Sequence, residues 1–270
     1  MSNNKILFTD LDGTLLNDDH RITTENKQTI QKALKHGHKV AIATGRPLSS
    51  GIILAKELDL TMPGCYTIAY NGGFIYDNAK EETIYESRIP LDYVLHIFEE
   101  AKNYGIHCQT YSDQELIGVE HSKELKRYFN STNIPYQVVD DLRSALSKDP
   151  GKVIVISYDP IKLKGFEDII APWAKGKVDY IYSNAHFLEF VNPGVSKGSA
   201  IKKLCQMLDI PMEHTISAGD APNDISMLTT THVAAVMANA TKEMKQYGTY
   251  ITTNDNNHSG VAEVIKKFML

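Results

Sequence analysis

Several residue types and patterns that define protein classes are scarce or missing in this chain of 270 residues. Its three cysteines, Cys65, Cys108 and Cys205, lie far apart and form no Cys-x-x-Cys pair, so a disulfide framework is not expected. The ten histidines show no His-Glu-x-x-His or other zinc spacing. No apolar run approaches the roughly 20 residues that cross a bilayer, and no signal-peptide core precedes Asp10. We therefore expect a cytoplasmic chain with no membrane partner.

The charge and size of the chain exclude further classes. Lys and Arg number 28 against 33 Asp and Glu, the net charge is −5, and no basic stripe is present, which argues against nucleic acid as a partner. An anionic substrate would therefore need positive charge placed locally. Hydrophobic residues make up 42% and charged residues 23%, which is typical of a globular protein, here long enough for a main domain with an inserted one. We expect a monomer or a weak homo-oligomer.

The first and last thirds of the sequence alternate between strand-like and helix-like segments. Ile6–Phe8, Val40–Ala43 and Tyr66–Ala69 are short apolar runs that predict buried strands. Helical spacing at about residues 24–36 separates the first two runs, and Thr215–Ala218 predicts a further strand near the end of the chain. Such alternation predicts a doubly wound, mostly parallel α/β sheet.

The middle third has a different pattern. After about residue 86 the predicted elements follow the order αββαβαβαββ, and the neighbouring pairs of strands predict an antiparallel sheet with helices on one face. We therefore predict a core made of residues 1–86 and 187–270. An inserted α+β cap is predicted at residues 87–186.

Candidate chemistry begins where the first strand ends, at Asp10-Leu11-Asp12-Gly13-Thr14. Strand alternation points Asp10 and Asp12 the same way, and two adjacent carboxylates repel unless a cation or a proton settles them. An Asx-rich turn is the alternative interpretation of this segment. An EF-hand calcium loop does not fit, because it would need glycine at its sixth position and an acid at its twelfth, where Arg21 stands.

Three more segments carry polar groups next to a strand end or a helix start, and the carboxyl ends of parallel strands are where such sheets bind ligands. Thr44-Gly45-Arg46 offers a hydroxyl and a backbone amide near a helix N-terminus, which suits a phosphate. Val195-Ser196-Lys197-Gly198 places a lysine against the helix dipole, which indicates an anion nearby. Gly219-Asp220-Ala221-Pro222-Asn223-Asp224 groups three oxygen-bearing side chains that suit Mg²⁺. Each segment alone also fits an ordinary helix cap or a surface lysine.

In this order, the four segments resemble the four motifs of the haloacid dehalogenase-like (HAD) phosphatases. The chain is similar, more narrowly, to the Cof-type branch, which includes bacterial sugar phosphatases; that similarity extends to Tyr70-Asn71-Gly72, Phe187-Leu188-Glu189-Phe190 and Gly260-Val261-Ala262. The resemblance implies a Rossmann-like core. Only 34 positions separate Asp10 from Thr44, whereas 153 separate Thr44 from Lys197, so the cap falls in the second interval and resembles the C2B type.

The resemblance also implies a magnesium-dependent phosphatase that acts through an aspartyl-phosphate. Asp10 would attack the phosphorus, and Asp12 would protonate the leaving alcohol and then deprotonate the attacking water. Mg²⁺ would be held by Asp10, Asp220 and the backbone carbonyl of Asp12, while Asp224 would orient Lys197 or the metal-bound waters. The implied phosphate-binding residues are Leu11, Thr44, Gly45, Lys197 and Asn223. Candidate substrate contacts are Arg46, Asn71 and His186.

The substrate class and several rival activities stay open. A small phosphorylated metabolite is expected, with hexose phosphates first and pyridoxal phosphate or flavin mononucleotide as alternatives. A sugar phosphomutase would share the core and the cap, and a non-catalytic sensor of phosphorylated metabolites is a further class. Gly194-Val195-Ser196-Lys197-Gly198 also matches the Gly-x-Ser-x-Gly motif, so a serine α/β-hydrolase that uses Ser196, His258 and one of two aspartates (Asp220 or Asp224) is the last alternative.

Overall fold

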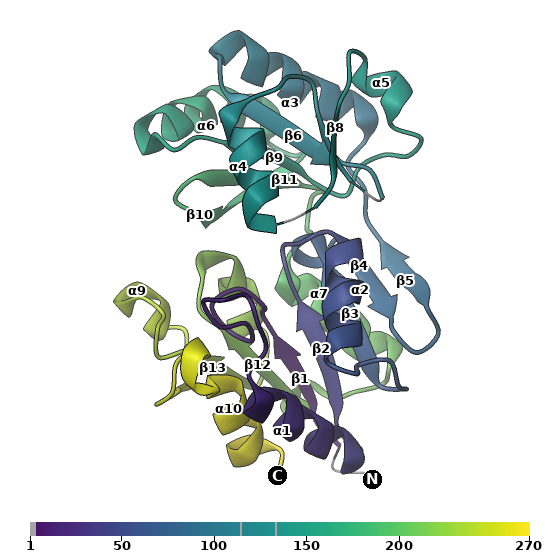
Figure 1. Cartoon of the computed structure of the whole chain (residues 1–270), viewed down its shortest axis with the longest axis vertical. Coiled ribbons are helices and arrows are strands. Elements are labelled where there is room, and N and C mark those ends of the chain that lie inside the picture. Colours follow the sequence, from purple (N-terminus) through teal and green to yellow (C-terminus); the bar gives the residue numbers. More distant parts are fainter. Residues whose placement is uncertain (1–3, 114, 133) are drawn as a thin grey trace. The chain divides into compact units, whose positions relative to one another are not determined.

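The structure is a computed structural model and describes residues 4–113, 115–132 and 134–270. The chain divides into two compact units, one formed by Met1–Tyr85 with Ser196–Leu270 and the other by Glu86–Val195. We call them the core unit and the cap unit (Figure 1). Within the described ranges, no helix is both long and apolar enough to span a bilayer.

The core unit is built on one eight-stranded sheet. Its strands are β1 (Ile6–Thr9), β2 (Lys39–Ala43), β3 (Cys65–Ala69), β4 (Phe74–Asp77), β5 (Glu82–Glu86), β12 (Thr215–Gly219), β13 (Val233–Val236) and β14 (Tyr250–Ile251). Their order in the sheet is β14-β13-β12-β1-β2-β3-β4-β5, so the first strand of the chain lies inside the sheet. The pairings from β14 through β3 are parallel, and β4 returns antiparallel to β3. Because β1 pairs with both β2 and β12, the loops that follow these three strands meet at one edge of the sheet.

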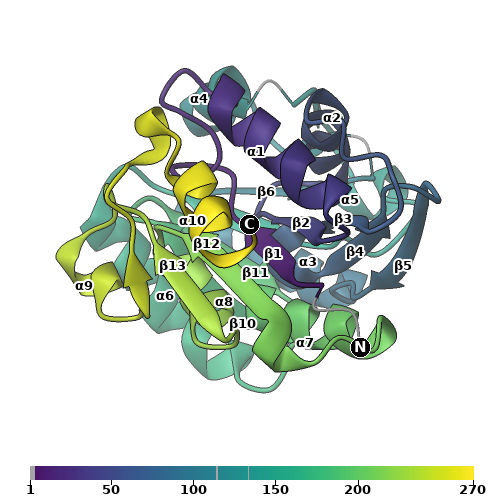
Figure 2. The ribbon, with the colours of Figure 1, turned by 90° about the horizontal axis from the view of Figure 1, so that it is seen from below.

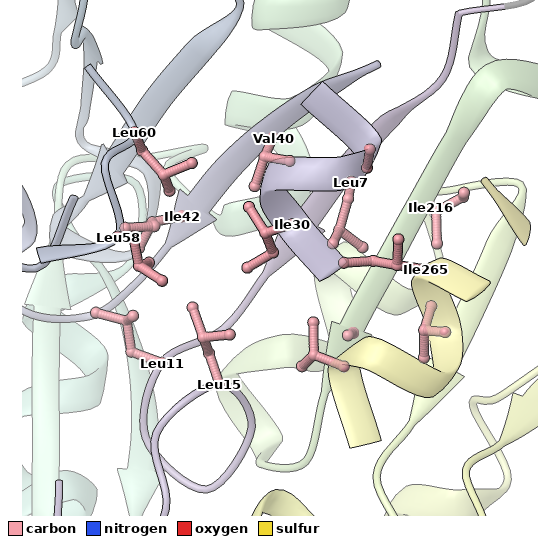
Figure 3. Packing of buried hydrophobic residues seen from close by; sticks show 14 of the residues in the cluster. Leu7, Leu11, Leu15, Ile30, Val40, Ile42, Leu58, Leu60, Ile216 and Ile265 are labelled. Atoms are coloured by element: carbon pink, nitrogen blue, oxygen red, sulfur yellow. The ribbon is translucent and has the colours of Figure 1, made fainter. Parts of the chain in front are cut away.

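Helices cover both faces of the core sheet. The helices of this unit are α1 (Thr24–Lys35), α2 (Leu48–Glu57), α7 (Lys197–Met207), α8 (Ile225–Leu228), α9 (Lys242–Lys245) and α10 (Gly260–Phe268), with short 3-10 helices η1 (Tyr70–Gly72), η2 (Met212–His214), η3 (Pro222–Asp224) and η4 (Asn256–His258). Leu7 of β1 is buried in one cluster with Ile30 of α1 and Ile265 of α10 (Figure 3). Its neighbour Phe8 is buried in another cluster with Ile201 of α7. Figure 2 shows α1 and α7 on opposite faces of the sheet, so the predicted doubly wound core is confirmed.

The cap unit has a sheet of its own, with six strands. They are β6 (His107–Tyr111), β7 (Leu116–Gly118), β8 (Tyr136–Val138), β9 (Val153–Ile156), β10 (Asp179–Asn184) and β11 (Phe187–Val191), and the helices are α3 (Leu91–Tyr104), α4 (Lys123–Thr132), α5 (Leu142–Ala145) and α6 (Pro160–Ala174). The strand order is β10-β11-β9-β6-β7-β8, with antiparallel pairs except for β7 and β8. Phe98 of α3 and Phe166 of α6 are buried with Val155 and Leu188 of the sheet, so these two helices pack on the same face of it.

The chain order of the cap elements is the predicted αββαβαβαββ, and the inserted α+β unit is confirmed. The predicted return to the core at residue 187 is wrong. Residues Phe187–Val191 form β11, which pairs with β9 on one side and β10 on the other inside the cap sheet. The core unit resumes at Ser196. An apolar strand pattern predicts the strand but not its partners, which explains the error.

Candidate active site

Three strand ends bring the predicted site residues of the core unit together. Asp10 follows β1, and its backbone N–H donates to the carbonyl of Ala218 at 2.9 Å, which extends the pairing with β12. Asp220 directly follows β12, and Thr44 directly follows β2 on the other side of β1. Parallel neighbours end at the same edge, so the residues after these strands lie close together although they are far apart in the sequence.

Lys197 lies at the centre of this group. Its ammonium Nζ is 2.5 Å from Oδ1 of Asp10 and 2.6 Å from Oδ1 of Asp224, and its side chain is 0% exposed. Burial alone would lower the pKa of Lys197, but the charges of Asp10 and Asp224 outweigh this effect and raise it above its ordinary value. Lys197 is therefore a fixed positive charge beside the Asp10 carboxylate.

Asp224 holds Lys197 in place. Its Oδ1 accepts from Lys197, and its Oδ2 accepts from the backbone N–H groups of Asp220 and Ala221 at 2.9 and 3.1 Å. A Cβ added to Gly219 would lie 2.7 Å from the Cβ of Asp224, so this strand end needs glycine for the close approach. Both carboxylate oxygens of Asp224 thus accept hydrogen bonds from other groups of the protein.

Asp220 is held by the loop that follows β1. Its Oδ1 accepts from the Thr14 hydroxyl at 2.7 Å, and a Cβ added to Gly13, whose φ is +78°, would come within 2.5 Å of its Oδ2. Burial, helped by the charge of Asp224, raises the pKa of Asp220 to about 7. Burial also raises the pKa of Asp10, although Lys197 opposes that shift. Both pKa values are raised mainly because burial penalises the charged carboxylate, and the neighbouring aspartates add to this effect.

The donor set fits a hard divalent cation. Carboxylate oxygens of Asp10, Asp220 and Asp224 lie within 4.8 Å of one another, and Lys197 is the ammonium that faces Asp10 and Asp224. Three carboxylates against one ammonium favour binding of a cation, and oxygen ligands are the kind that Mg²⁺ takes. Because the oxygens of Asp224 are engaged by Lys197 and two N–H groups, Asp10 and Asp220 are the carboxylates that fit a metal.

Asp12 has a different cationic partner. Its carboxylate accepts from Nε of Arg46 at 2.8 Å and from Nη2 at 2.5 Å, a two-point ion pair. Arg46 comes from the loop after β2, two residues beyond Thr44. The two aspartates of the first motif are therefore held by separate cations, Asp10 by Lys197 and Asp12 by Arg46.

The η1 turn supports the candidate phosphate-binding loops. The Asn71 N–H donates to the carbonyl of Thr44 at 3.0 Å, and the Asn71 Oδ1 accepts from the side chain of Asn223 at 3.2 Å. A Cβ on Gly45 would lie 2.9 Å from that same Oδ1. Gly72, with φ +109°, packs against the start of α7, where an added Cβ would lie 2.2 Å from the Ser196 carbonyl. Asn71 is thus placed as a structural link between loops.

Two of the predicted site residues, Leu11 and His186, are not among the polar side chains of the core unit described above. The Leu11 side chain is 0% exposed in the hydrophobic core, so only its backbone amide is suited to phosphate. His186 belongs to the cap unit, in the turn between β10 and β11, where its ring lies 5.0 Å from that of Tyr158. The Thr14 hydroxyl was not predicted as a site residue, although its place in the first motif was a usable signal.

The serine-hydrolase interpretation is wrong for Ser196. Its hydroxyl accepts from the Ser199 N–H at 3.0 Å and caps α7, while its own N–H donates to the Ser199 hydroxyl. Its backbone is ordinary extended chain, with φ −158° and ψ 161°, and not a strained nucleophile turn. The proposed partner His258 is instead hydrogen-bonded to Asp255 at 2.6 Å and is exposed.

Comparison with known proteins agrees with this geometry. A model of the haloacid dehalogenase-like hydrolase family matches residues 7–265, and the chain belongs to this family. It is 33% identical, over 98% of both chains, to the Streptococcus pyogenes serotype M6 protein M6_Spy0533, which carries a provisional phosphatase name. It is 28% identical, over 97% of both chains, to the Bacillus subtilis protein YitU, named as a 5-amino-6-(5-phospho-D-ribitylamino)uracil phosphatase.

A solved structure extends the comparison to the fold. The HAD subclass IIB sugar phosphatase BT4131 aligns with a TM-score of 0.82 and 25% identity, over 98% of this chain and 99% of that one. The predicted class, a phosphatase of the haloacid dehalogenase-like family, is confirmed, and the non-catalytic sensor is set aside.

Proposed function

We propose that the protein is a magnesium-dependent phosphomonoesterase that hydrolyses a small phosphorylated metabolite through an aspartyl-phosphate on Asp10. The observation that carries this proposal is the buried Asp10 carboxylate, fixed 2.5 Å from the Lys197 ammonium and close to Asp220. A carboxylate nucleophile needs such a setting, because it must approach an anionic phosphoryl group without strong repulsion.

Each side chain of the group has a separate part in the reaction. Asp10 attacks the phosphorus as the bond to the leaving oxygen breaks, and Lys197 offsets the charge at the point of attack. Asp12 protonates the leaving oxygen and then takes a proton from the water that hydrolyses the aspartyl-phosphate. When bound by Asp10, Asp220 and the Asp12 carbonyl, Mg²⁺ supplies positive charge that offsets the repulsion between carboxylate and phosphoryl group. Phosphate oxygens are bound by the Thr44 hydroxyl, the Leu11 and Gly45 amides and the Asn223 side chain.

A sugar phosphate is the proposed substrate class. BT4131 is named a sugar phosphatase, and the substrate in the name of YitU carries a phosphorylated ribityl chain, so both names refer to phosphate esters of polyhydroxylated compounds. We propose that the cap unit selects the organic part of the substrate. Pyridoxal phosphate and flavin mononucleotide are the alternatives to be screened beside hexose phosphates.

The test is phosphate release by Asp10→Asn compared with Asp19→Asn, a matched change of an exposed aspartate nearby. We expect Asp10→Asn to lower kcat by at least about 1,000-fold, as for other nucleophile deletions. Borohydride added during turnover should convert residue 10 of the unaltered enzyme to homoserine, which mass spectrometry detects. Full activity of Asp10→Asn would contradict the covalent role. Formation of an isomeric sugar phosphate without free phosphate would identify a phosphomutase instead.

A further inference from the structure

The ion pair between Asp12 and Arg46 joins the two loops that flank the nucleophile. Nε and Nη2 of Arg46 each donate to a different oxygen of Asp12, at 2.8 and 2.5 Å. The Arg46 side chain is 16% exposed and that of Asp12 is 48% exposed. The Arg46 backbone is fixed as well, because its N–H donates to the Thr44 hydroxyl and its carbonyl accepts from the Tyr70 N–H, both at 3.0 Å. Arg46 is therefore fixed by its own contacts, and its guanidinium in turn fixes the more exposed Asp12 carboxylate.

We propose that Arg46 is a positioning residue that fixes the orientation of the Asp12 carboxylate for proton exchange with the leaving oxygen and then with water. This inference rests on the proposed function, in which Asp12 is the acid and base. It differs from a role for Arg46 as a substrate contact, because it acts through Asp12 alone.

The chemistry needs a fixed carboxylate. In the first half-reaction the Asp10 oxygen bonds to phosphorus as the bond to the leaving oxygen breaks, and that oxygen takes the proton of Asp12. In the second, the water oxygen bonds to phosphorus as the Asp10 oxygen leaves, and Asp12 takes the proton of the water. The leaving oxygen and the attacking water occupy the same side of the phosphorus, so a rotated Asp12 carboxylate would slow both steps.

A two-point pair supplies the orientation that a single charge does not. A guanidinium fork fixes the plane of a carboxylate, whereas an ammonium leaves it free to rotate. Each carboxylate oxygen keeps a further lone pair, so the pair with Arg46 leaves room for a proton. His20 is a further basic residue near Asp12, but its ring nitrogen is 3.9 Å away and beyond hydrogen-bonding distance.

The experiment measures single-turnover release of alcohol and of phosphate by Arg46→Ala and Arg46→Lys. The control is Arg143→Ala, which removes an exposed arginine–aspartate pair in the cap unit. With an alkyl phosphate, whose leaving oxygen needs a proton, we expect Arg46→Ala to be about 100-fold slower. With p-nitrophenyl phosphate, the release of nitrophenol should change by less than about 3-fold, since that leaving group needs no acid. Arg46→Lys should resemble Arg46→Ala.

Two further measurements separate positioning from substrate binding. Added guanidinium should restore part of the rate of Arg46→Ala but not that of Asp12→Asn. In the Asp12→Asn background, Arg46→Ala should cost less than about 3-fold more, because the two residues act as a unit. The inhibition constant for inorganic phosphate should be unchanged.

The opposite results overturn the proposal. Additive losses in the double variant, full activity of Arg46→Lys, or weaker phosphate inhibition by Arg46→Ala would make Arg46 a substrate or charge contact. If Asp10→Asn also releases phosphate at full rate, the proposed function fails and the positioning role that rests on it fails too. If Asp10→Asn is inactive while Arg46→Ala releases alcohol and phosphate at the unaltered rate, only the positioning role fails.

Discussion

Asp220 and Asp224 lie close together after β12 but have different partners, so their isosteric amides should affect stability differently. The buried carboxylate of Asp224 accepts from the Lys197 ammonium and from two backbone N–H groups. The side chain of Asp224→Asn has one acceptor oxygen, so its NH₂ group must face either the ammonium or the N–H groups, all of which are donors. The Thr14 hydroxyl donates to Asp220, and an amide oxygen in Asp220→Asn can still accept that bond.

The magnitudes follow from burial. Removing one partner from a buried ion pair costs about 3–5 kcal/mol of unfolding free energy. Each kcal/mol shifts the Tm of a unit of this size by about 2–4 °C, so Asp224→Asn should melt roughly 10 °C lower in EDTA. Asp220→Asn removes a carboxylate that is penalised by burial and by the nearby charge of Asp224, and its metal-free Tm should be equal or higher. Its affinity for Mg²⁺ should fall by at least about 10–100-fold.

Thermal unfolding in EDTA, followed by far-UV circular dichroism, measures both variants. The single tryptophan, Trp173, lies in α6 of the cap unit, so its emission wavelength reports unfolding of the cap. The unfolding temperature measured from this emission should be unchanged in both variants. If Asp224→Asn is as stable as the unaltered protein in EDTA and loses only Mg²⁺ affinity, then Asp224 is a metal ligand and the assignment made from its hydrogen bonds is wrong. Destabilisation of Asp220→Asn in EDTA would also contradict it.

Two other changes test the capping serine and a buried histidine. Ser196→Ala should lower stability by about 1 kcal/mol and leave phosphate release within a few-fold, whereas a folded but inactive variant would contradict a role limited to capping α7. Burial lowers the pKa of His107, which is hydrogen-bonded to Gln109 and Ser122. The contribution of neutral His107 to the unfolding free energy of the cap should therefore be fully present above about pH 6.5, and it should decrease as the pH drops below that value. Urea unfolding followed by Trp173 emission checks this, and His107→Gln should flatten the pH dependence.

Much of the site could be predicted because parallel strands end at a common edge. Residues after β1 and β12 were expected to be neighbours once both were interpreted as strands of one parallel sheet, and Asp10 and Asp220 are neighbours. The helix that begins at Lys197 could also be predicted from its apolar spacing. The capping serine before it involves only residues close together in the sequence, so it is accessible to sequence analysis as well.

The remaining contacts depend on pairings that no local pattern specifies. The hydrogen bond from Asn223 to Asn71 joins residues 152 positions apart, and the pair of Arg46 with Asp12 depends on β1 and β2 being neighbours in the sheet. The same limit explains the misplaced boundary at residue 187. The strand was recognised, but its hydrogen-bonding partners in the cap sheet were not.

The order of the strands also bears on how the chain folds as it is synthesised. β1 is made first, yet one of its two neighbours in the sheet is β12, which is more than 200 residues further along the chain. The cap unit is a continuous segment, Glu86–Val195, and among its described residues the six strands of the cap sheet pair with one another. On a ribosome the cap can therefore fold while one edge of β1 is still unpaired, and that edge stays unpaired until Thr215–Gly219 has emerged. The site is among the last parts of the molecule to form.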